Sequence, residues 1–455
     1  MADIADDQTS YDLDQELAPS VRLALASGNK TGLTELIDPL HAADIADLLE
    51  QLTAGERREF LALAPETVGG DVLSELAEGV RESVLDFLPQ AQVAEAVRDL
   101  ESDDVVDIIE DLNEAQQEEL LEALEDADRV AVEQALSYPE DSAGRLMQRE
   151  VVMAPKHWTV GEAIDFLRAS ASLPEQFYHM ILVDPRMRPT GYVTLGRLLG
   201  SKRTVKLMDI VEDSFRIIPA IQDEAEVAYA FNQYHLISAP VVDEDERLVG
   251  VITIDDAMIV LDEEHEEDIL RLAGVSESSL ADRVIATTQR RFPWLAVNLV
   301  TAIVASLVIA LFEDAIAEIV ALAVLMPIVA SMGGNAGTQS LTVAVRSIAT
   351  KDLTASNLWR VIRRECLVGL VNGVIFAVAM GAVGILWFGS PKLGLVIALA
   401  MVINLIVAGL AGAAIPVLLD KLGIDPALAS GAFVTTVTDV VGFFAFLGLA
   451  VVILL

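Results

Sequence analysis

The spacing of apolar residues divides the chain into three stretches, and the first is a series of short helical patterns. Between residue 20 and about 140, apolar positions recur at helical intervals. In 44–64, for example, Leu48, Leu49 and Leu52 share one stripe. The same pattern returns sixty residues later, at 104–124. Repeated short helices that cannot bury their apolar faces alone predict a small superhelical stack, which we assign to residues 1–140.

The second stretch, residues 141–262, contains another repeat, at an offset of 59. ILVDPRMRPTGYVTL at 181–195 matches PVVDEDERLVGVITI at 240–254. Each copy predicts helix, strand, turn, strand and helix, and therefore an α/β domain.

This second repeat resembles a tandem CBS pair. The resemblance places Thr253 and Asp256 where such pairs hold the ribose of a nucleotide such as ATP, whereas Arg197 replaces that aspartate in the first copy. Two interpretations stay open, a nucleotide site in the second cleft and a cleft that only pairs the two copies.

The third stretch, residues 292–455, is apolar and predicts a transmembrane domain of five helices, because each segment holds about the 20 residues that a bilayer crossing needs. The expected spans are 292–312, 317–349, 365–388, 393–419 and 428–455. The second is long enough to extend beyond the membrane. Before them, residues 263–291 begin with an acidic cluster and predict an amphipathic connecting, or plug, helix that reaches the membrane.

Charge is distributed very unevenly. Residues 1–291 hold 62 acidic and 23 basic side chains, and residues 292–455 hold 8 and 7. Nucleic acid is not expected as a partner, because the sequence offers no basic face large enough to neutralise a row of phosphates. With acids spread over almost every surface segment, a single exposed Asp or Glu indicates only surface solvation. A cation site requires carboxylates that converge.

Topology follows from the ends of these segments. The acidic N-terminus lacks the positive start and apolar core of a signal peptide. Arginines precede the first span and cluster between the second and third, against a lone Lys392 on the opposite side. The positive-inside rule therefore predicts a multi-pass protein of the cell membrane with a cytoplasmic N-terminus. The single cysteine, Cys366, excludes an internal disulfide and any cysteine metal cluster.

The first unusual membrane segment is MPIVASMGGNAGTQS at 326–340. Pro327 and the glycines loosen the helix backbone, and freed carbonyls are tolerated at this depth only when buried or facing water. Glycines alone favour close helix packing. With Asn335 and Gln339 one turn apart, we expect this segment to line a pore.

The second segment is VTTVTDVVG at 434–442, where Thr435, Thr438, Asp439 and Gly442 are expected to share one helix face. Hydroxyl, carboxylate and carbonyl oxygens suit Mg²⁺, which keeps several of its waters. Soft-metal sites would need His or Cys, and none is near. The alternative is an Asp439 that is only hydrogen-bonded to a neighbouring helix.

Together these residues resemble the MgtE family of magnesium channels and transporters, over essentially the whole chain. The GGNAGTQ and TTVTDVVG stretches are the most specific part of the resemblance. It implies a homodimer in membrane lipid, with a pore between the second and fifth spans of both subunits. Asp439 would be the central Mg²⁺ ligand, with Thr435 and Asn335 beside it.

The same resemblance implies that Mg²⁺ is regulator as well as substrate. Ions bound between the helical domain, the CBS pair and the connecting helix would close the pore when internal Mg²⁺ is plentiful. His235, Ile259 and Ala225 depart from positions where the family can carry acids, which leaves the number of sensor ions open. The matching sensor positions are Asp103, Asp107, Asp256, Glu264, Glu267 and Asp268.

The sequence therefore predicts Mg²⁺-regulated Mg²⁺ uptake, by a channel or a coupled carrier. The alternatives are transport of another divalent cation such as Co²⁺ or Mn²⁺, and a membrane regulator that senses nucleotide through its CBS pair. An enzyme is not expected, because Walker A, HExxH and GxSxG motifs are all missing from the sequence.

Overall fold

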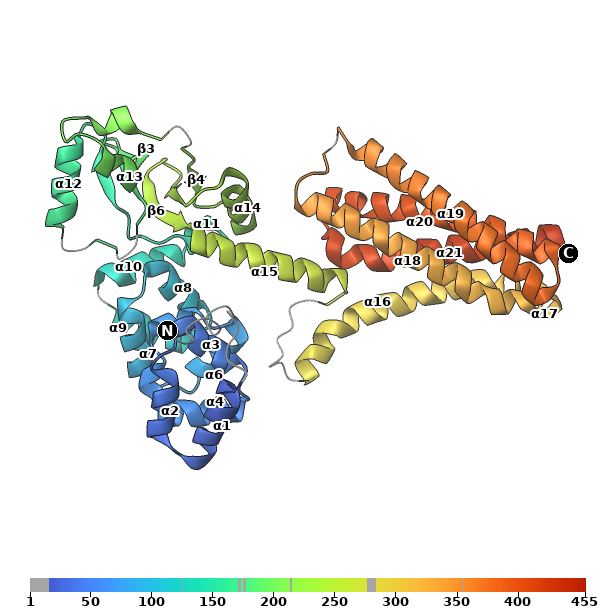
Figure 1. Cartoon of the computed structure of the whole chain (residues 1–455), viewed down its shortest axis with the longest axis horizontal. Helices are drawn as coiled ribbons and strands as arrows, with labels where there is room; N and C mark the ends of the chain where they lie inside the picture. Colours follow the sequence, from blue (N-terminus) through green and yellow to red (C-terminus); the bar gives the residue numbers. More distant parts are fainter. Residues whose placement is uncertain are drawn as a thin grey trace, which may run out of the picture. The chain divides into compact units, whose positions relative to one another are not determined.

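The computed structural model describes residues 16–124, 126–170, 173–174, 177–212, 215–275, 284–354 and 356–455. The chain forms two compact units, Met1–Glu264 and His265–Leu455, which we call the N-terminal unit and the membrane unit and describe separately (Figure 1). Residues 1–15 of the expected helical domain and 276–283 of the expected connecting helix lie outside the described residues.

The helical part of the N-terminal unit confirms the sixty-residue repeat. Helices α3 (Ala42–Glu50) and α4 (Ala54–Leu63) recur as α8 (Ser102–Glu110) and α9 (Glu114–Ala123). Capping boxes begin both α4 and α9, with the N-cap side chain and the side chain three residues later bonded reciprocally. The remaining helices are α1 (Leu17–Ser27), α2 (Lys30–Ile37), α5 (Gly70–Ser74), α6 (Glu78–Leu85), α7 (Gln90–Ala96), α10 (Asp126–Ala135) and the 3₁₀ turns Pro65–Thr67 and Val97–Asp99.

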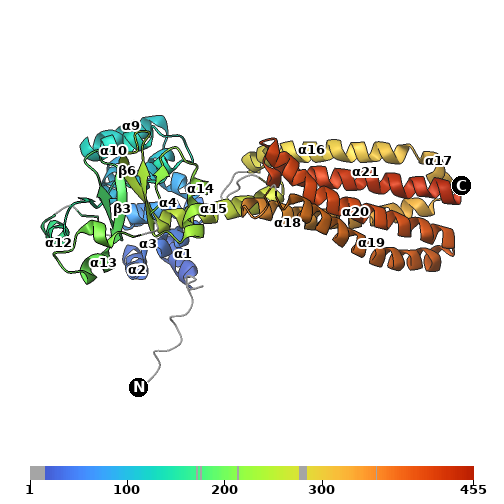
Figure 2. The same ribbon diagram turned by 90° about the horizontal axis from the view of Figure 1, so that it is seen from above.

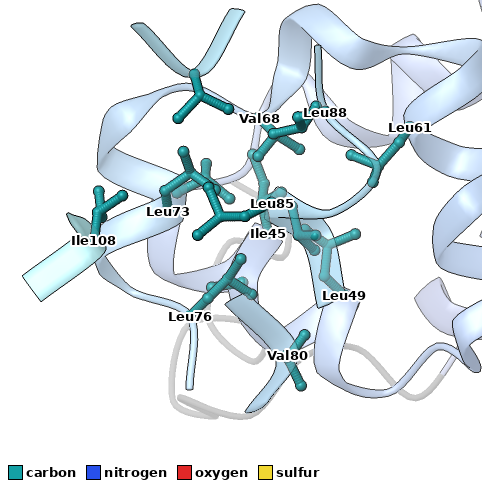
Figure 3. Packing of buried hydrophobic residues seen from close by; sticks show 14 of the residues in the cluster. Ile45, Leu49, Leu61, Val68, Leu73, Leu76, Val80, Leu85, Leu88 and Ile108 are labelled. Atoms are coloured by element: carbon teal, nitrogen blue, oxygen red, sulfur yellow. The ribbon is translucent and has the colours of Figure 1, made fainter. Parts of the chain in front are cut away.

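These helices share one apolar core. Figure 3 shows Ile45 and Leu49 of α3, Leu73 of α5 and Ile108 of α8 in one cluster. Leu49, Leu73 and Ile108 are fully buried. Because both copies of the repeat contribute to one core, neither could fold as a separate domain.

The α/β part holds two three-stranded sheets that confirm the 59-residue repeat. Strands β2 (His179–Val183) and β3 (Pro189–Thr194) pair antiparallel, as do β5 (Ser238–Val242) and β6 (Leu248–Thr253). Two short strands were not predicted, β1 (Met153–Pro155) and β4 (Ile218–Pro219), which pair parallel with β2 and β5. The helices of this part are α11 (Ala143–Leu146), α12 (Val160–Ala169), α13 (Leu195–Gly200), α14 (Glu224–Tyr234) and the 3₁₀ turn Leu207–Ile210.

The expectation of a separate connecting helix over 263–291 is wrong in two respects, because the helix begins earlier than residue 263 and ends well before residue 291. Helix α15 runs without a break from Ile254 to Leu272, so the last helix of the second repeat and the acidic segment are one element. It ends at Gly274, whose φ of +72° is the left-handed conformation that favours glycine. The N–H of Val275 bonds to the Leu270 carbonyl and that of Gly274 to the Arg271 carbonyl, a Schellman motif that stops the helix.

The membrane unit confirms five helices long and apolar enough to span a bilayer among the described residues. They run side by side in both views (Figures 1 and 2). The expected 317–349 span is divided, because the short helix α17 (Glu313–Glu318) precedes it, and the expected third span begins seven residues too late. The five are α16 (Val284–Ala310), α18 (Ala321–Ala349), α19 (Leu358–Phe388), α20 (Pro391–Lys421) and α21 (Pro426–Leu454).

Glycines bring α19 against α20. A Cβ added to Gly369 would lie 2.3 Å from the Leu405 carbonyl oxygen, and one added to Gly384 would lie 2.9 Å from Gly394 Cα. Close approach through small residues is the usual way that helices associate in lipid. Helix α20 also packs on α18 and α21, so it forms the centre of the bundle.

Candidate metal sites

Asp439 lies in a groove of the membrane unit. The groove has a volume of about 420 Å³. Thr435 and Asp439 of α21 line it with Thr338 of α18 and with Asn298 and Thr301 of α16. The groove therefore collects one carboxylate and several neutral polar side chains in an otherwise apolar bundle.

The expected polar face of α21 is divided between two directions. Thr435 and Asp439, four residues apart, line the groove, whereas Thr438 is fully buried. Thr438 donates to the Thr435 carbonyl at 3.0 Å, and Gly442 faces the buried Asn404. The prediction of one shared face is thus wrong for Thr438, which is buried, and for Gly442, which packs against Asn404 of α20.

Asn335 lies on α18 outside the lining of this groove. Its Nδ2 atom is 3.4 Å from Ser331 Oγ, and its side chain is exposed. Ser331, Asn335, Thr338 and Thr342 follow one another at steps of four, three and four residues, and all are exposed. The described part of the chain leaves this polar stripe of α18 uncovered.

The glycines of the same segment have two roles. A Cβ at Gly337 would lie 2.6 Å from Val434 Cγ1, and one at Gly333 would overlap the Asn404 side chain, whereas a Cβ at Gly334 would meet nothing within 4 Å. Gly333 and Gly337 therefore pack helices, which confirms part of the packing interpretation.

Sequence reasoning missed two buried polar groups. Asn404 of α20 is fully buried and donates from Nδ2 to the Val329 carbonyl at 2.8 Å. Glu365 of α19 is buried and accepts a hydrogen bond from Ser340 Oγ at 2.9 Å. A polar residue inside an apolar span is the available signal in both cases.

In the N-terminal unit, half-buried acids of α8 lie near the first turn of α15. Burial, with the Asp256 and Asp104 carboxylates beside it, raises the pKa of Asp103 well above its usual range. Burial and the Asp256 carboxylate raise the pKa of Asp104 to about 7. Burial raises the pKa of Asp256 to about 6, against hydrogen bonds from Thr253 that lower it. The structure thus places Asp103, Asp104 and Asp256 near one another.

Asp107, by contrast, already has a cationic partner. Its carboxylate forms an ion pair with Arg81 of α6, whose Nε atom also contacts Asp111. The Arg81 and Asp111 side chains are only 5% and 7% exposed. Asp107 therefore belongs to an ion pair that fastens α6 to α8, a partner that the sequence did not reveal.

The acids of α15 have different neighbours in the two units. Within the N-terminal unit, Glu263 and Glu264 of α15 lie near Glu224 of α14. Burial, with the Asp141, Glu263, Asp223 and Glu264 carboxylates nearby, raises the pKa of Glu224 to about 7. Glu224 was not predicted. Within the membrane unit, Glu267 pairs with Arg271, and Arg271 Nε lies 3.5 Å from Asp425 Oδ2 at the start of α21. Burial and Asp425 raise the pKa of Asp268, although Arg271 lowers it.

None of these groups has the geometry of an assembled metal site. In the ranges that the structure describes, no three His, Cys, Asp or Glu side chains converge so that they could hold a metal ion. A cation at the Asp103–Asp256 cluster would therefore complete its coordination with water or backbone oxygens, as Mg²⁺ commonly does.

The two residues expected to hold a ribose bond to each other. Thr253 Oγ1 donates to Asp256 Oδ2 at 2.7 Å, and the Thr253 N–H is 3.4 Å from the same oxygen. Both bonds run from Thr253 to the Asp256 carboxylate, which thereby holds the residue that precedes the first turn of α15. In the first copy, Arg197 Nε pairs with Glu212 at 2.9 Å.

Family models match the N-terminal unit and most of the membrane unit. The family model described as "Divalent cation transporter" matches residues 326–449, the one described as "MgtE intracellular N domain" matches 40–141, and the CBS domain model matches 143–202 and 209–263. A magnesium transporter MgtE of Thermus thermophilus is 34% identical over 445 residues, which are 96% of this chain and 98% of that protein. A magnesium transporter MgtE of Bacillus subtilis is 33% identical over 321 residues, covering 70% of this chain and 71% of that protein.

Among solved structures, the cytosolic domain of the Mg²⁺ channel MgtE in complex with ATP is 31% identical with a TM-score of 0.49, and covers 53% of this chain and 99% of that one. The match to the Thermus thermophilus protein extends over nearly the full length of both chains, and family models match near both ends of this one. The chain belongs to the MgtE family of divalent cation transporters.

Proposed function

We propose that this chain carries Mg²⁺ across the cell membrane as a homodimer, through a pore between α18 and α21 of the two copies. The observation that carries the proposal is the placement of Asp439 and Thr435 in one groove of an apolar bundle. A carboxylate at this depth costs roughly 2.5–3.5 kcal/mol, so its presence indicates a function. The groove also lies in the region that the divalent cation transporter model matches.

The uncovered stripe on α18 supports the dimer. Ser331, Asn335 and Thr342 would face lipid in a single copy, and Thr338 of the same stripe lines the groove. A second copy related by a twofold axis would set the same stripe against itself and enclose a polar path. Two Asp439 carboxylates facing each other would repel without a cation between them, and a hydrated Mg²⁺ bound through Asp439, Thr435 and Asn335 removes that repulsion.

The direction of insertion follows from charge. Arg346, Lys351, Arg360, Arg363 and Arg364 lie where α18 ends and α19 begins. The positive-inside rule puts that end, and with it the N-terminal unit, in the cytoplasm.

Regulation by internal Mg²⁺ is supported by the acids of α8 and α15. Asp103 and Asp256, with Glu264, Glu267 and Asp268, form the proposed sensor. Burial raises the pKa values of Asp103 and Asp256, and the Asp256 carboxylate adds to the effect at Asp103. A bound divalent cation would stabilise both carboxylates in their ionised form. A cation at Asp107 would have to displace Arg81, so we assign Asp107 a secondary role.

The pore assignment is tested with Asp439→Asn, which keeps the shape of the side chain and removes its charge. In proteoliposomes that report Mg²⁺ entry by a trapped dye, we expect at least about a tenfold loss of flux, equivalent to 1.4 kcal/mol or more. Asp420→Asn, on an exposed acid at the end of α20, is the matched control. Normal flux through Asp439→Asn would refute the pore.

The sensor is tested separately. Glu264→Gln, Glu267→Gln and Asp268→Asn in one protein should keep flux but shift its inhibition by internal Mg²⁺ to higher concentration. Glu244→Gln with Asp245→Asn in the exposed turn before β6, together with Glu59→Gln on α4, removes the same number of negative charges elsewhere and is the control. An unchanged inhibition curve would remove the sensor from α15.

Two narrower alternatives can be separated by binding and competition. Oxygen ligands also accept Co²⁺ and Mn²⁺, so uptake of Mg²⁺ in the presence of each ion gives the selectivity. ATP binding at Thr253 and Asp256 would have to replace the hydrogen bond between them, and titration calorimetry with Thr253→Val tests this site.

A further inference from the structure

One face of α19 forms a groove that the proposed ion pathway does not use. The groove has a volume of about 510 Å³. Its lining residues recur at intervals of three and four, which puts them on a single stripe of the helix. They are Arg360, Arg363, Arg364, Leu367, Val368, Val371 and Asn372.

The opposite face of α19 is the one that packs against the bundle. Glu365, Gly369 and Gly373 are buried there, and a Cβ on Gly369 would meet the Leu405 carbonyl oxygen of α20. The groove therefore points away from α20. Leu367, Val368 and Val371 are exposed in it, at 50%, 45% and 59%.

The arginines of the groove have no acidic partner in the described part of the chain. No ion pair joins Arg360, Arg363 or Arg364 to a carboxylate, whereas Arg81, Arg145 and Arg203 in the N-terminal unit are all paired. The adjacent Glu365 is turned to Ser340 instead. In a chain with a net charge of −40, three guanidinium groups within five residues are a local concentration of positive charge.

The shape and polarity of the groove match an amphiphile in one leaflet. Twelve residues separate Arg360 from Asn372, which is a rise of about 18 Å. Half of a bilayer's hydrocarbon core is about 15 Å. The charged end of the groove lies at the start of the helix beside Trp359, which is 74% exposed, as aromatic residues at a membrane interface often are.

We propose that this groove binds one anionic phospholipid. Arg360, Arg363 and Arg364 hold its phosphate through charge-assisted hydrogen bonds, and an acyl chain lies along Leu367, Val368 and Val371. A second copy of this chain is a poorer occupant, because a twofold contact through the stripe would bring arginines against arginines. Topology alone explains positive charge at this end, but it requires no apolar groove continuous with that charge.

The test is native mass spectrometry of the purified full-length chain, titrated with dioleoylphosphatidylglycerol. Wild type should bind at least one such lipid per chain, and Arg360→Gln, Arg363→Gln, Arg364→Gln should weaken it at least about fivefold. Arg290→Gln, Arg291→Gln, Lys421→Gln removes the same charge elsewhere and should bind as wild type does. Equal binding by both triple variants would overturn the proposal.

Further arms identify the ligand and protect the test from misfolding. Dioleoylphosphatidylcholine should bind at least about fivefold more weakly, and excess inorganic phosphate should not displace the anionic lipid. The opposite result in either experiment would reject a site that recognises both the charged headgroup and the acyl chain of a lipid. Val371→Trp fills the apolar groove and keeps the arginines. It should also weaken binding, and its failure to do so in a monodisperse protein would equally reject the site. Mg²⁺ flux is measured apart from binding, so failure of the pore proposal leaves these outcomes unchanged.

Discussion

The two units of this protein use carboxylates in opposite ways. In the N-terminal unit acids are abundant, and most are exposed to solvent or form an ion pair with an arginine. Asp107 and Asp111, for example, both pair with Arg81. In the membrane unit they are few, and each inside the bundle has a defined environment. Glu365 accepts from Ser340, and Asp439 faces a groove. The number of acids is therefore a poor guide to cation binding, and their surroundings are a good one.

The difference arises from the solvent of each unit. Water stabilises a surface carboxylate without help from the protein, whereas lipid does not, so an acid in the membrane persists only with a partner or a polar cavity. The half-buried acids Asp103, Asp104 and Asp256 also have limited access to water, which raises their pKa values.

The largest effect is expected at the ion pair of the N-terminal unit. Arg81→Met would leave the buried Asp111 carboxylate uncompensated and cost about 3–5 kcal/mol of unfolding free energy. Urea unfolding followed by circular dichroism measures it. Arg22→Gln, at an exposed pair with Glu56, should cost less than about 1 kcal/mol. A similar loss of unfolding free energy in both variants would contradict the distinction between buried and exposed ion pairs.

A steric effect comes next, in the membrane unit. Gly337→Ala would press against Val434 and should cost about 1–3 kcal/mol through overpacking. Thermal unfolding in detergent measures the loss. Gly334→Ala meets open space one turn away and should leave the melting temperature within error. If the two variants melt alike, the helices do not pack as described.

The pH dependence of the N-terminal unit should have a definite sign. The folded protein raises the pKa of Asp104 from its ordinary 3.8 to about 7, so the native state retains a proton that the unfolded chain releases. Stability should therefore fall as pH rises from about 4 to 7 and level off above, by at most about 1.4 kcal/mol per pH unit for this group. Asp104→Asn should flatten the profile between pH 5 and 7, measured by hydrogen exchange of α8 in the full chain.

The smallest effect is expected where α15 begins. Thr253→Val removes the hydroxyl that bonds to Asp256 and should cost about 0.5–2 kcal/mol. Thr253→Ser keeps the hydroxyl and should stay close to wild type in the same unfolding experiment. A stable Val variant would show that the pair does not hold the helix start.

Much of the fold could be predicted from sequence because its signals are local. The repeats at sixty and 59 residues reappear as α3–α4 against α8–α9 and as β2–β3 against β5–β6. Five apolar spans also followed from residue type alone. Strands β1 and β4 were missed because three and two residues carry no periodicity, and their pairing with β2 and β5 is decided by distant parts of the chain.

The candidate sites were predictable only in part, since a pattern gives residue types but not partners. Asp439 and Thr435 share a groove as expected, and Asp103 lies near Asp256. The partner of Asp107 lies on another helix, and Asn404 meets α18 through tertiary packing that no spacing encodes. Side-chain direction within α21 also depended on its neighbours, which bury Thr438.

Asn404 has a consequence for how such sequences can change. Its side chain fills the space that a Cβ on Gly333 of α18 or on Gly442 of α21 would need. Three positions on three helices thus share one small volume. Enlarging either glycine requires a smaller residue at 404, and the hydrogen bond to Val329 would be lost with it. We therefore expect substitutions at positions 333, 404 and 442 to occur together. Gly333→Ala alone should destabilise the protein, and Asn404→Gly in the same protein should make room for the added methyl group.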